Sequence, residues 1–143
     1  MKDQAESSVE KAERLFKDGC NCSQAVLAAF ADELGLDEQV AMKVACGFGG
    51  GLARQREVCG AVSGAAMVIG MRIGADKAKC YEAVQCFCEN FRNETGSIIC
   101  RELLKGVGAT AGGAPEARTA EYYRKRPCVE LVKIAARIVS DLD

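Results

Sequence analysis

The chain contains no histidine and no tryptophan among its 143 residues. Histidine is the base of Ser-His-Asp and Cys-His enzymes, a ligand of mixed Cys/His zinc sites and the common proximal ligand of haem. All of these sites are therefore excluded. Any chemistry must come from cysteine, carboxylates, lysine, arginine, tyrosine or a bound cofactor.

Long apolar runs and an excess of charge of one sign are also missing. The longest uncharged run, residues 58–71, has fourteen residues, which is shorter than the roughly 20 needed to span a bilayer. This run therefore predicts a buried helix. Nineteen basic and twenty acidic residues give a net charge of −1. This balance gives no electrostatic reason for binding nucleic acid or an anionic membrane, so we expect neither a nucleic-acid partner nor membrane insertion.

Cysteine is abundant. The beginning of the chain, MKDQAESSVEKAERLF, is polar and lacks the apolar stretch of a secretion signal, so we expect a cytoplasmic protein. A reducing compartment disfavours a framework of disulfides and favours metal-binding or catalytic thiols. The nine cysteines are Cys20, Cys22, Cys46, Cys59, Cys80, Cys86, Cys88, Cys100 and Cys128.

Helical periodicity dominates the chain, and no run of alternating apolar and polar residues indicates a strand. The length suits one domain with one core, and 49% of the residues are hydrophobic. We therefore predict an all-α fold, an irregular bundle of about six to seven helices, as a single domain over residues 1–143. Residues 1–6 are expected to be a frayed end.

The helix boundaries follow from capping residues and glycines. Ser7 or Ser8 and Asp37 are expected to begin helices, whereas Gly19 and Gly35 are expected to end them. The clearest loop is 106–119, and a short turn is expected at 121–123. The predicted helices are 8–18, 22–34, 37–46, 59–73, 76–94, 98–105 and 128–141.

The predicted helix 59–73 is rich in small residues. Gly60 and Gly64 are four residues apart, as are Gly70 and Gly74, and residues at this spacing share one helix face. Glycines on such a face allow close backbone approach. This pattern predicts a central helix that is crossed tightly by its neighbours, or a helix backbone that is pressed against a bound group.

Three cysteines lie on the predicted helix 76–94. Cys80 and Cys88 share its apolar face and are expected to pack in the core, whereas Cys86 falls on the polar face and is expected to be exposed or at an interface. Cys46 is likewise interpreted as a packing residue, since free cysteine is often simply buried.

Four other cysteines lie at or near the beginning of a predicted helix: Cys22, Cys59, Cys100 and Cys128. Free N–H groups and a partial positive charge at such an end favour a thiolate and also stabilise an anionic iron–sulfur cluster. We therefore predict that these four form a shared site. Cys20 forms a Cys-x-Cys pair with Cys22; a resolving thiol, a spare ligand and a packing role all remain open for it.

The cysteine spacing matches no short motif. There is no Cys-x-x-Cys pair, as in thioredoxin or a zinc ribbon, and no closely spaced ferredoxin run. The glycine segment 47–51 also lacks the Gly-Lys-Ser/Thr ending of a phosphate-binding loop. We expect the bare backbone of Gly49, Gly50, Gly51 and Gly60 to approach the cysteine site and donate N–H groups to sulfur. A flexible connector is an equally compatible interpretation of segment 47–51.

Basic residues precede two of the four cysteines. Arg54 and Arg56 lie before Cys59, and the run 124–126 lies before Cys128. Such charges could lower a thiol pKa or attract an anionic partner. The usual explanation of a charged run is a solvated surface, and the sequence favours this explanation slightly.

The chain resembles the C-GCAxxG-C-C family of redox-active proteins over about residues 9–140. The resemblance is carried by Asn-Cys-Ser-Gln-Ala-Val at 21–26, Phe-Gly-Gly-Gly at 48–51, the signature Cys-Gly-Ala-Val-Ser-Gly at 59–64, and then Cys100 and Cys128. It implies a redox site formed by four cysteines. Those four are Cys22, Cys59, Cys100 and Cys128.

The additional cysteines, especially Cys80, Cys86 and Cys88, depart from the family's four-cysteine pattern. Their presence leaves open whether the chain has a second metal site or none. Cys86 and the glycine face of helix 59–73 would also suit a contact in a homodimer.

Three functions remain in competition. In the first, the four cysteines bind an iron–sulfur cluster that carries or senses electrons and exchanges them with a redox partner protein. In the second, two of them cycle as a metal-free dithiol–disulfide oxidoreductase. In the third, they hold zinc and stabilise a binding module.

Overall fold

The structure is a computed structural model that describes residues 6–142. The expected frayed end, 1–6, lies outside the described residues except for Glu6. The Glu6 carboxylate accepts a hydrogen bond of 2.9 Å from Nε of Arg14.

The all-α prediction is confirmed over the described residues. No strand occurs in them, apart from one isolated bridge between Val58 and Ile99. No helix in this part of the chain is long and apolar enough to cross a membrane. The elements are α1 (Ser8–Lys17), α2 (Cys22–Ala29), α3 (Ala31–Leu34), α4 (Glu38–Ala45), the short 3₁₀ helix η1 (Cys46–Phe48), α5 (Gly49–Leu52), α6 (Gly60–Ile73), α7 (Lys77–Thr95), α8 (Cys100–Leu103), α9 (Ala120–Lys125) and α10 (Cys128–Asp141).

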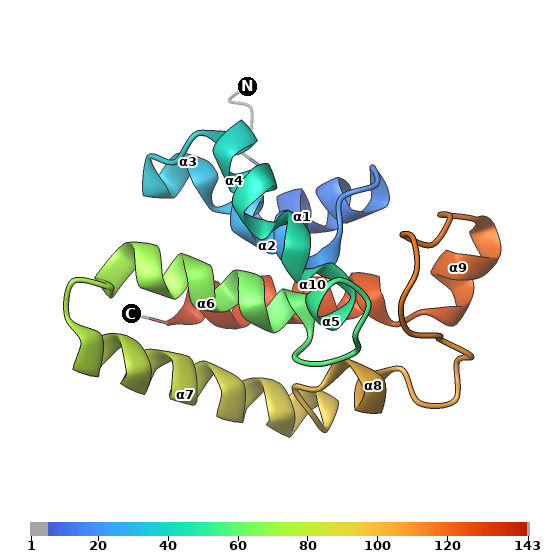
Figure 1. The fold of residues 1–143 in the computed structure, drawn as a ribbon. Coiled ribbons are helices and arrows are strands. Elements are labelled where there is room, and N and C mark those ends of the chain that lie inside the picture. The colour runs from blue at the N-terminus through green and yellow to red at the C-terminus, as the bar shows by residue number, and fades with distance from the viewer. Residues whose placement is uncertain (1–5, 143) are drawn as a thin grey trace.

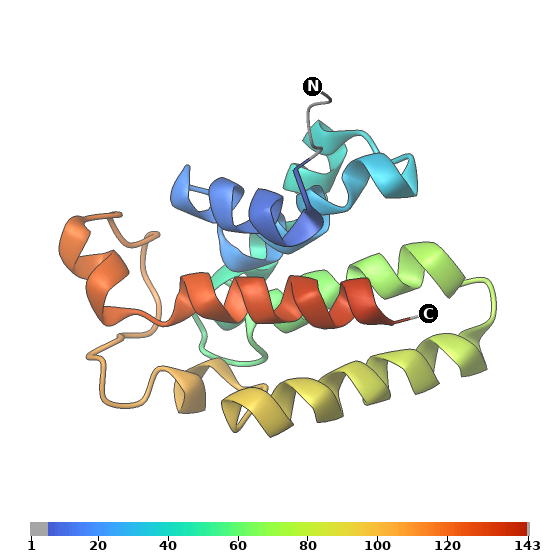
Figure 2. The same ribbon diagram turned by 180° about the vertical axis from the view of Figure 1, so that it is seen from behind.

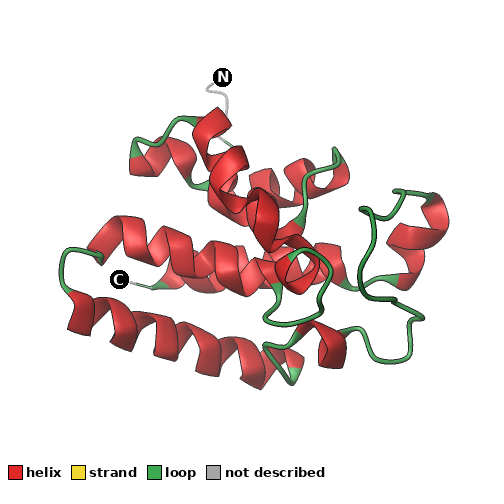
Figure 3. Ribbon diagram, viewed as in Figure 1, coloured by secondary structure: helices red, strands yellow, loops and turns green. Residues whose placement is uncertain are grey.

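The helices form three layers (Figure 1). The middle layer consists of α6 and α10, which run side by side. Helices α1 to α4 cover one side of this pair and α7 covers the other, as the reverse view also shows (Figure 2). The long loops around 53–59 and 104–119 both lie at the end of the bundle where α6 and α10 begin (Figure 3).

Short-range capping explains several helix boundaries. The Ser7 side chain accepts from the N–H of Glu10 at 3.0 Å, and the Glu10 carboxylate accepts from the N–H of Ser7 at 2.9 Å. Asn21 and Gln24 form the equivalent reciprocal pair at the start of α2. These pairs satisfy backbone donors that a helix leaves free at its first turn.

The core is centred on α6, and its first glycine pair confirms the expected close packing. A Cβ placed on Gly64 would lie 2.8 Å from the carbonyl oxygen of Ser23 in α2. The second pair does not behave this way, because a Cβ on Gly70 would meet nothing within 4 Å. Close crossing is therefore confined to the first half of α6.

Two predicted helices were too long. The predicted helix 22–34 breaks at Phe30 into α2 and α3, where the Phe30 backbone leaves the helical region with φ of −103° and ψ of 6°. The predicted helix 98–105 retains only α8, because residues 97–99 are extended against the segment before α6. There the N–H of Cys59 donates to the carbonyl of Ile98 at 2.8 Å.

The glycine segment leads into a left-handed backbone. Gly50 and Gly51 have φ of 68°, and the following non-glycine residues Leu52, Ala53 and Arg54 have φ of 69°, 49° and 65°. L-residues rarely adopt this region in succession. The turn is closed by backbone hydrogen bonds, such as that from Glu57 N–H to the Gly51 carbonyl at 2.9 Å. Residues 50–57 therefore form a turn that is closed by backbone hydrogen bonds.

Candidate functional site

The four cysteines at the predicted helix starts line one cavity of about 60 Å³. This volume has room for roughly four to six water-sized groups, at about 10–15 Å³ for each water. The exposed fractions of the four residues are 9% for Cys22, 3% for Cys59, 7% for Cys100 and 7% for Cys128. Segments far apart in the sequence thus bring four buried sulfur atoms together, as the prediction of a shared site requires.

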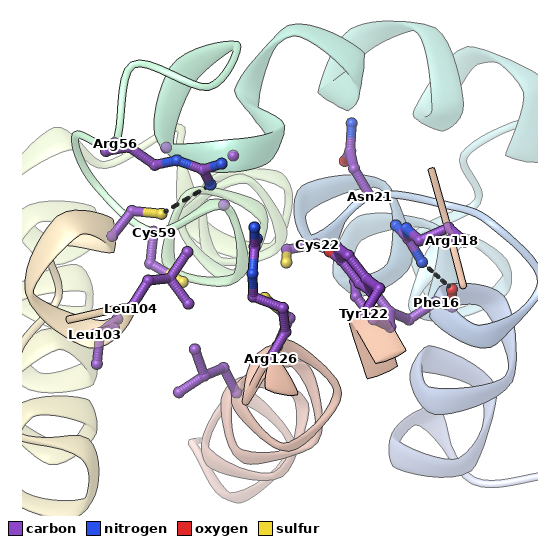
Figure 4. Close-up of a pocket in the computed structure, with 16 residues that line it drawn as sticks. Phe16, Asn21, Cys22, Arg56, Cys59, Leu103, Leu104, Arg118, Tyr122 and Arg126 are labelled. Carbon is purple, nitrogen blue, oxygen red and sulfur yellow. Dashed lines mark hydrogen bonds between the residues drawn. The ribbon is translucent and has the colours of Figure 1, made fainter. Parts of the chain in front are cut away.

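Each of these cysteines lies where a helix begins. Cys22, Cys100 and Cys128 are the first residues of α2, α8 and α10, and Cys59 immediately precedes α6 as its N-cap. Figure 4 shows Cys22 and Cys59 among the side chains that line the cavity. The cavity therefore lies at the end of the bundle where three of its longer helices start.

Cys59 and Cys100 are brought together by the extended segments before their helices. The N–H of Cys59 donates to the Ile98 carbonyl at 2.8 Å, and the N–H of Cys100 donates to the Glu57 carbonyl at 2.6 Å. Burial raises the pKa of the Cys59 thiol to about 12, and the N–H groups of Ala61 and Val62 oppose this increase. Cys59 is therefore a neutral thiol when no cation binds it.

Cys22 and Cys128 form the most polarised pair of the site. The hydrogen bond from the Cys22 thiol is the main cause that lowers the pKa of Cys128 to about 7, and the Arg126 charge and the Tyr122 hydroxyl contribute. The same hydrogen bond and burial raise the pKa of Cys22 well above its usual value. The pair therefore places its negative charge on Cys128.

Cys100 faces an arginine. Nη1 of Arg56 lies 3.7 Å from its Sγ and donates to it. Burial raises the pKa of the Cys100 thiol, and the Arg56 guanidinium opposes that increase. Arg56 also donates from Nε to the Thr110 carbonyl at 3.0 Å, which fixes its orientation.

The cavity is electropositive. Arg56, Arg118 and Arg126 line it, and no carboxylate is among the described residues that do so. Arg56 is 7% exposed and Arg126 is 8% exposed, so the surface-run interpretation is wrong for both. It holds for Arg124 and Lys125, which are exposed. The difference arises because a guanidinium can be buried where carbonyls, aromatic rings and sulfur surround it.

Glycines allow the backbone to approach the sulfur-bearing residues, as expected. Gly50, Gly51 and Gly60 line the cavity, whereas Gly49 lies beside it. A Cβ on Gly51 would lie 2.7 Å from Cβ of Cys100. A Cβ on Gly60 would lie 3.2 Å from Cβ of Cys22. Donation of their N–H groups to sulfur remains a prediction.

The other five cysteines lie outside the cavity. Cys20 is half-buried, with its Sγ 3.7 Å from Sδ of Met42. Cys46 is exposed, which corrects its interpretation as a core residue: α4 ends at Ala45, and the 3₁₀ turn rotates Cys46 outward. Cys80 and Cys88 are half-buried and pack against the core, and Cys86 is exposed, as expected.

Two polar lining residues, Arg118 and Tyr122, were not identified as site residues from the sequence. Arg118, in the loop before α9, donates to the carbonyls of Phe16 and Cys20, each at 2.8 Å. Its guanidinium carbon lies 4.2 Å from the centre of the Phe16 ring. Tyr122 of α9 also lines the cavity. A single arginine in a glycine-rich loop carries no signal of such a role.

The four sulfur atoms do not form a site for one metal ion. Among residues 6–142, no group of three or more Cys, Asp or Glu side chains has an arrangement that could hold a metal ion. The thiols are also unlinked, since all nine cysteines are free.

One family model matches this chain, over residues 20–142, and its description is "Putative redox-active protein (C_GCAxxG_C_C)". The match includes all four cysteines of the cavity. No curated protein and no solved structure shows significant similarity to the chain. The match extends over most of the sequence and names the family that the sequence resembles. The chain belongs to the C_GCAxxG_C_C family.

Proposed function

We propose that the chain binds an iron–sulfur cluster through Cys22, Cys59, Cys100 and Cys128 and uses it for electron transfer or redox sensing. The observation that carries the proposal is the convergence of these four buried cysteines on one cavity that is lined by three arginines and no carboxylate. A bound cluster would supply one-electron chemistry at this position.

The donor set fits such a group. Thiolates are the usual ligands of iron–sulfur clusters, and a thiolate-bound cluster is anionic. Burying this negative charge requires compensation, and the cavity provides it through Arg56, Arg118 and Arg126. The four helix starts add N–H groups and partial positive charge on the same side.

The residues around the sulfur atoms would set the reduction potential. Hydrogen bonds to ligand sulfur and low solvent exposure are the main determinants that a protein controls. Here Arg56 donates to Cys100 at 3.7 Å, and all four cysteines are 9% exposed or less. Electrons would be exchanged with a separate redox partner protein.

Zinc fits this arrangement less well. A tetrahedral zinc site with Zn–S bonds of about 2.3 Å brings its sulfur atoms within about 3.8 Å of one another. No described group of three cysteines or carboxylates has an arrangement for one ion. A cluster is larger and spreads its ligands further apart, so the zinc-stabilised module ranks below it.

The second candidate is a metal-free dithiol–disulfide oxidoreductase, and the Cys22–Cys128 pair favours it. The thiolate of Cys128, with its pKa of about 7, would attack one sulfur of a substrate disulfide and release the other sulfur as a thiolate. Cys22, after losing its proton to solvent, would then attack Cys128, form the Cys22–Cys128 disulfide and release the second substrate thiolate. The substrate disulfide gains the two electrons that the cysteine pair loses.

The test is anaerobic purification followed by an absorption spectrum and analysis of iron, sulfide and zinc. The cluster proposal predicts a brown protein with a broad absorption band at about 400 nm and matching iron and sulfide contents. Serine variants of the four cavity cysteines should each reduce the iron content. Cys46→Ser and Cys86→Ser are matched controls, because both residues are exposed and outside the cavity. Both control variants should retain the iron content of the unmodified chain.

A colourless, iron-free chain that cannot be reconstituted with iron and sulfide would overturn the cluster proposal. Disulfide exchange activity that is lost in Cys128→Ser and stalls as a mixed disulfide in Cys22→Ser would then support the dithiol candidate. Stoichiometric zinc, with unfolding on chelation, would support the structural module instead.

A further inference from the structure

A second cavity of about 340 Å³ adjoins the cysteine cavity. We call it the vestibule. Arg56, Arg118 and Arg126 line both cavities, as do Asn21, Gly50 and Tyr122. The volume lies within the range of small-molecule sites, which are typically about 300–1,000 Å³. A molecule in the vestibule would therefore lie directly against the residues that surround the sulfur atoms.

The vestibule carries uncompensated positive charge. Four arginines line it, at positions 54, 56, 118 and 126, but Glu116 is the only carboxylate among the described residues that do so. Glu116 pairs with Arg126 and lies 3.6 Å from Nη1 of Arg54. One carboxylate cannot neutralise four guanidinium groups.

The remaining hydrogen-bond partners of these arginines are carbonyl and hydroxyl groups, together with the Cys100 sulfur that Arg56 contacts. Arg54 donates from Nε to the Gly112 carbonyl at 2.8 Å and from Nη2 to the Thr110 hydroxyl at 3.0 Å. Arg56 donates to the Thr110 carbonyl. Arg118 donates to the carbonyls of Phe16 and Cys20. These bonds orient the guanidinium groups without cancelling their charge, so the site is preorganised for an anion.

The backbone that presents two of the arginines is strained. Arg54 and Arg56 have φ of 65° and 61°, at the end of the left-handed turn that begins at Gly50. Non-glycine residues in this region cost free energy, and such strain persists where the surroundings impose it, commonly at ligand sites. Two strained arginines that converge on one cavity from the same turn are an observation independent of the charge count.

We propose that the vestibule binds a small anionic molecule through its carboxylate or phosphate oxygens and holds it against the cysteine site. Guanidinium groups are the preferred partners of both oxyanions. The proposal goes beyond the redox function, because anion binding here depends on arginines and requires no cluster.

The test is calorimetric titration of the reduced, metal-free chain with glutarate and with inorganic phosphate. Glutaramide, the neutral diamide of glutarate, is the control ligand. We expect saturable binding of at least one anion, weakened by salt, and no binding of glutaramide. Glutarate alone would assign the site to dicarboxylates, phosphate alone would assign it to phosphorylated molecules, and both results support the proposal.

Two variants should act in opposite directions. Arg54→Gln removes a cation that lines only the vestibule, and it should weaken anion binding by about tenfold. Glu116→Gln removes the competing carboxylate, and it should tighten binding by about threefold. Arg137→Gln is the matched control, because Arg137 pairs with Glu94 and does not line the vestibule. It should leave binding unchanged.

The proposal would be overturned if neither glutarate nor phosphate showed saturable binding at concentrations up to about 10 mM. Equal binding of glutaramide would also overturn it, as would a change in the same direction in Arg54→Gln and Glu116→Gln when circular dichroism shows both variants to be folded. None of these results depends on iron or sulfide content. A failure of this proposal is therefore distinguishable from a failure of the cluster proposal.

Discussion

Nη1 of Arg56 lies 3.7 Å from Sγ of Cys100, and both residues are buried, with exposed fractions of 7% each. A buried guanidinium normally faces a carboxylate, but no Asp or Glu lies within salt-bridge distance of Arg56 among the described residues. Its partner at this position is the Cys100 sulfur. This pair connects the strained turn after α5 to the start of α8.

Replacing Arg56 with glutamine should raise the pKa of the Cys100 thiol. The guanidinium opposes the increase that burial causes, and an adjacent opposite charge typically lowers a pKa by about 1–3 units. We expect the alkylation rate of Cys100, followed by mass spectrometry of its peptide, to decrease at pH 8 in the metal-free chain. Arg56→Lys keeps the charge and should restore part of the rate. An unchanged pKa in Arg56→Gln would show that the contact has no electrostatic effect.

Cys128 should ionise near neutral pH in the reduced, metal-free chain. Its pKa of about 7 predicts half-maximal alkylation near pH 7, in contrast to Cys59, whose pKa of about 12 keeps it unreactive there. Cys22→Ala removes the hydrogen-bond donor and should move the midpoint upward, whereas Cys22→Ser keeps a donor and should move it less. A midpoint near 9.0, the ordinary value, would contradict this prediction.

The same ionisation predicts a pH dependence of stability. The pKa of Cys128 is lower in the folded chain, about 7, than its ordinary value of 9.0. Such a group stabilises the folded state fully above the unfolded pKa, and this contribution is lost as the pH falls through the folded pKa. The free energy of unfolding of the wild-type chain relative to Cys128→Ser should therefore rise between about pH 7 and pH 9. Urea unfolding at several pH values measures it, and a decrease over this range would contradict the assignment.

Alanine substitutions at two glycines of α6 should have opposite effects. A Cβ on Gly64 would lie 2.8 Å from the Ser23 carbonyl oxygen, so Gly64→Ala should destabilise the chain by about 1–3 kcal/mol. A Cβ on Gly70 would meet nothing within 4 Å, so Gly70→Ala should stabilise it by about 0.5–1 kcal/mol. Urea unfolding followed by far-ultraviolet circular dichroism compares the free energies of unfolding of the two variants. Equal effects would mean that α2 and α6 pack less closely than described.

Arg118→Ala should release the loop before α9 and destabilise the chain by about 2 kcal/mol. The substitution removes two hydrogen bonds to the carbonyls of Phe16 and Cys20 and the contact with the Phe16 ring. Hydrogen exchange should show faster exchange at Tyr123, whose N–H donates to the Thr119 carbonyl in this region. Arg124→Ala, at an exposed arginine, is the control and should change neither quantity. Unchanged exchange in Arg118→Ala would show that other contacts hold the loop.

Local signals account for the parts of the fold that the sequence predicts well. The serine at position 7, the aspartates at 37 and 76 and the glycines at 35 and 96 act within one helical turn, and each begins or ends a helix in the structure. The predicted positions of the four cysteines at helix starts also agree with the structure, which brings the four together at one cavity. Their distances from one another depend on the packing of α1, α2, α6 and α10, which no local pattern encodes.

The remaining features depend on tertiary contacts. Burial of Arg56 and Arg126 requires partners from the loop 106–119, such as Thr110 and Glu116, which are far away in the sequence. The shortening of α8 arises from pairing between Ile99 and Val58. Cys46 was misassigned because the predicted helix includes it, whereas α4 ends one residue earlier and Cys46 begins a 3₁₀ turn. Each case reflects competition between a local preference and a partner elsewhere in the chain.

The helices that carry Cys22 and Cys128 stand at opposite ends of the sequence, and α10 packs against both α1 and α2. During synthesis the first three cysteines leave the ribosome while the fourth is still missing, and chains are made at about 5–20 residues per second. The complete donor set exists only after α10 has emerged and docked. A chain that lacks α10 would therefore expose the other three thiols without a cavity to enclose them.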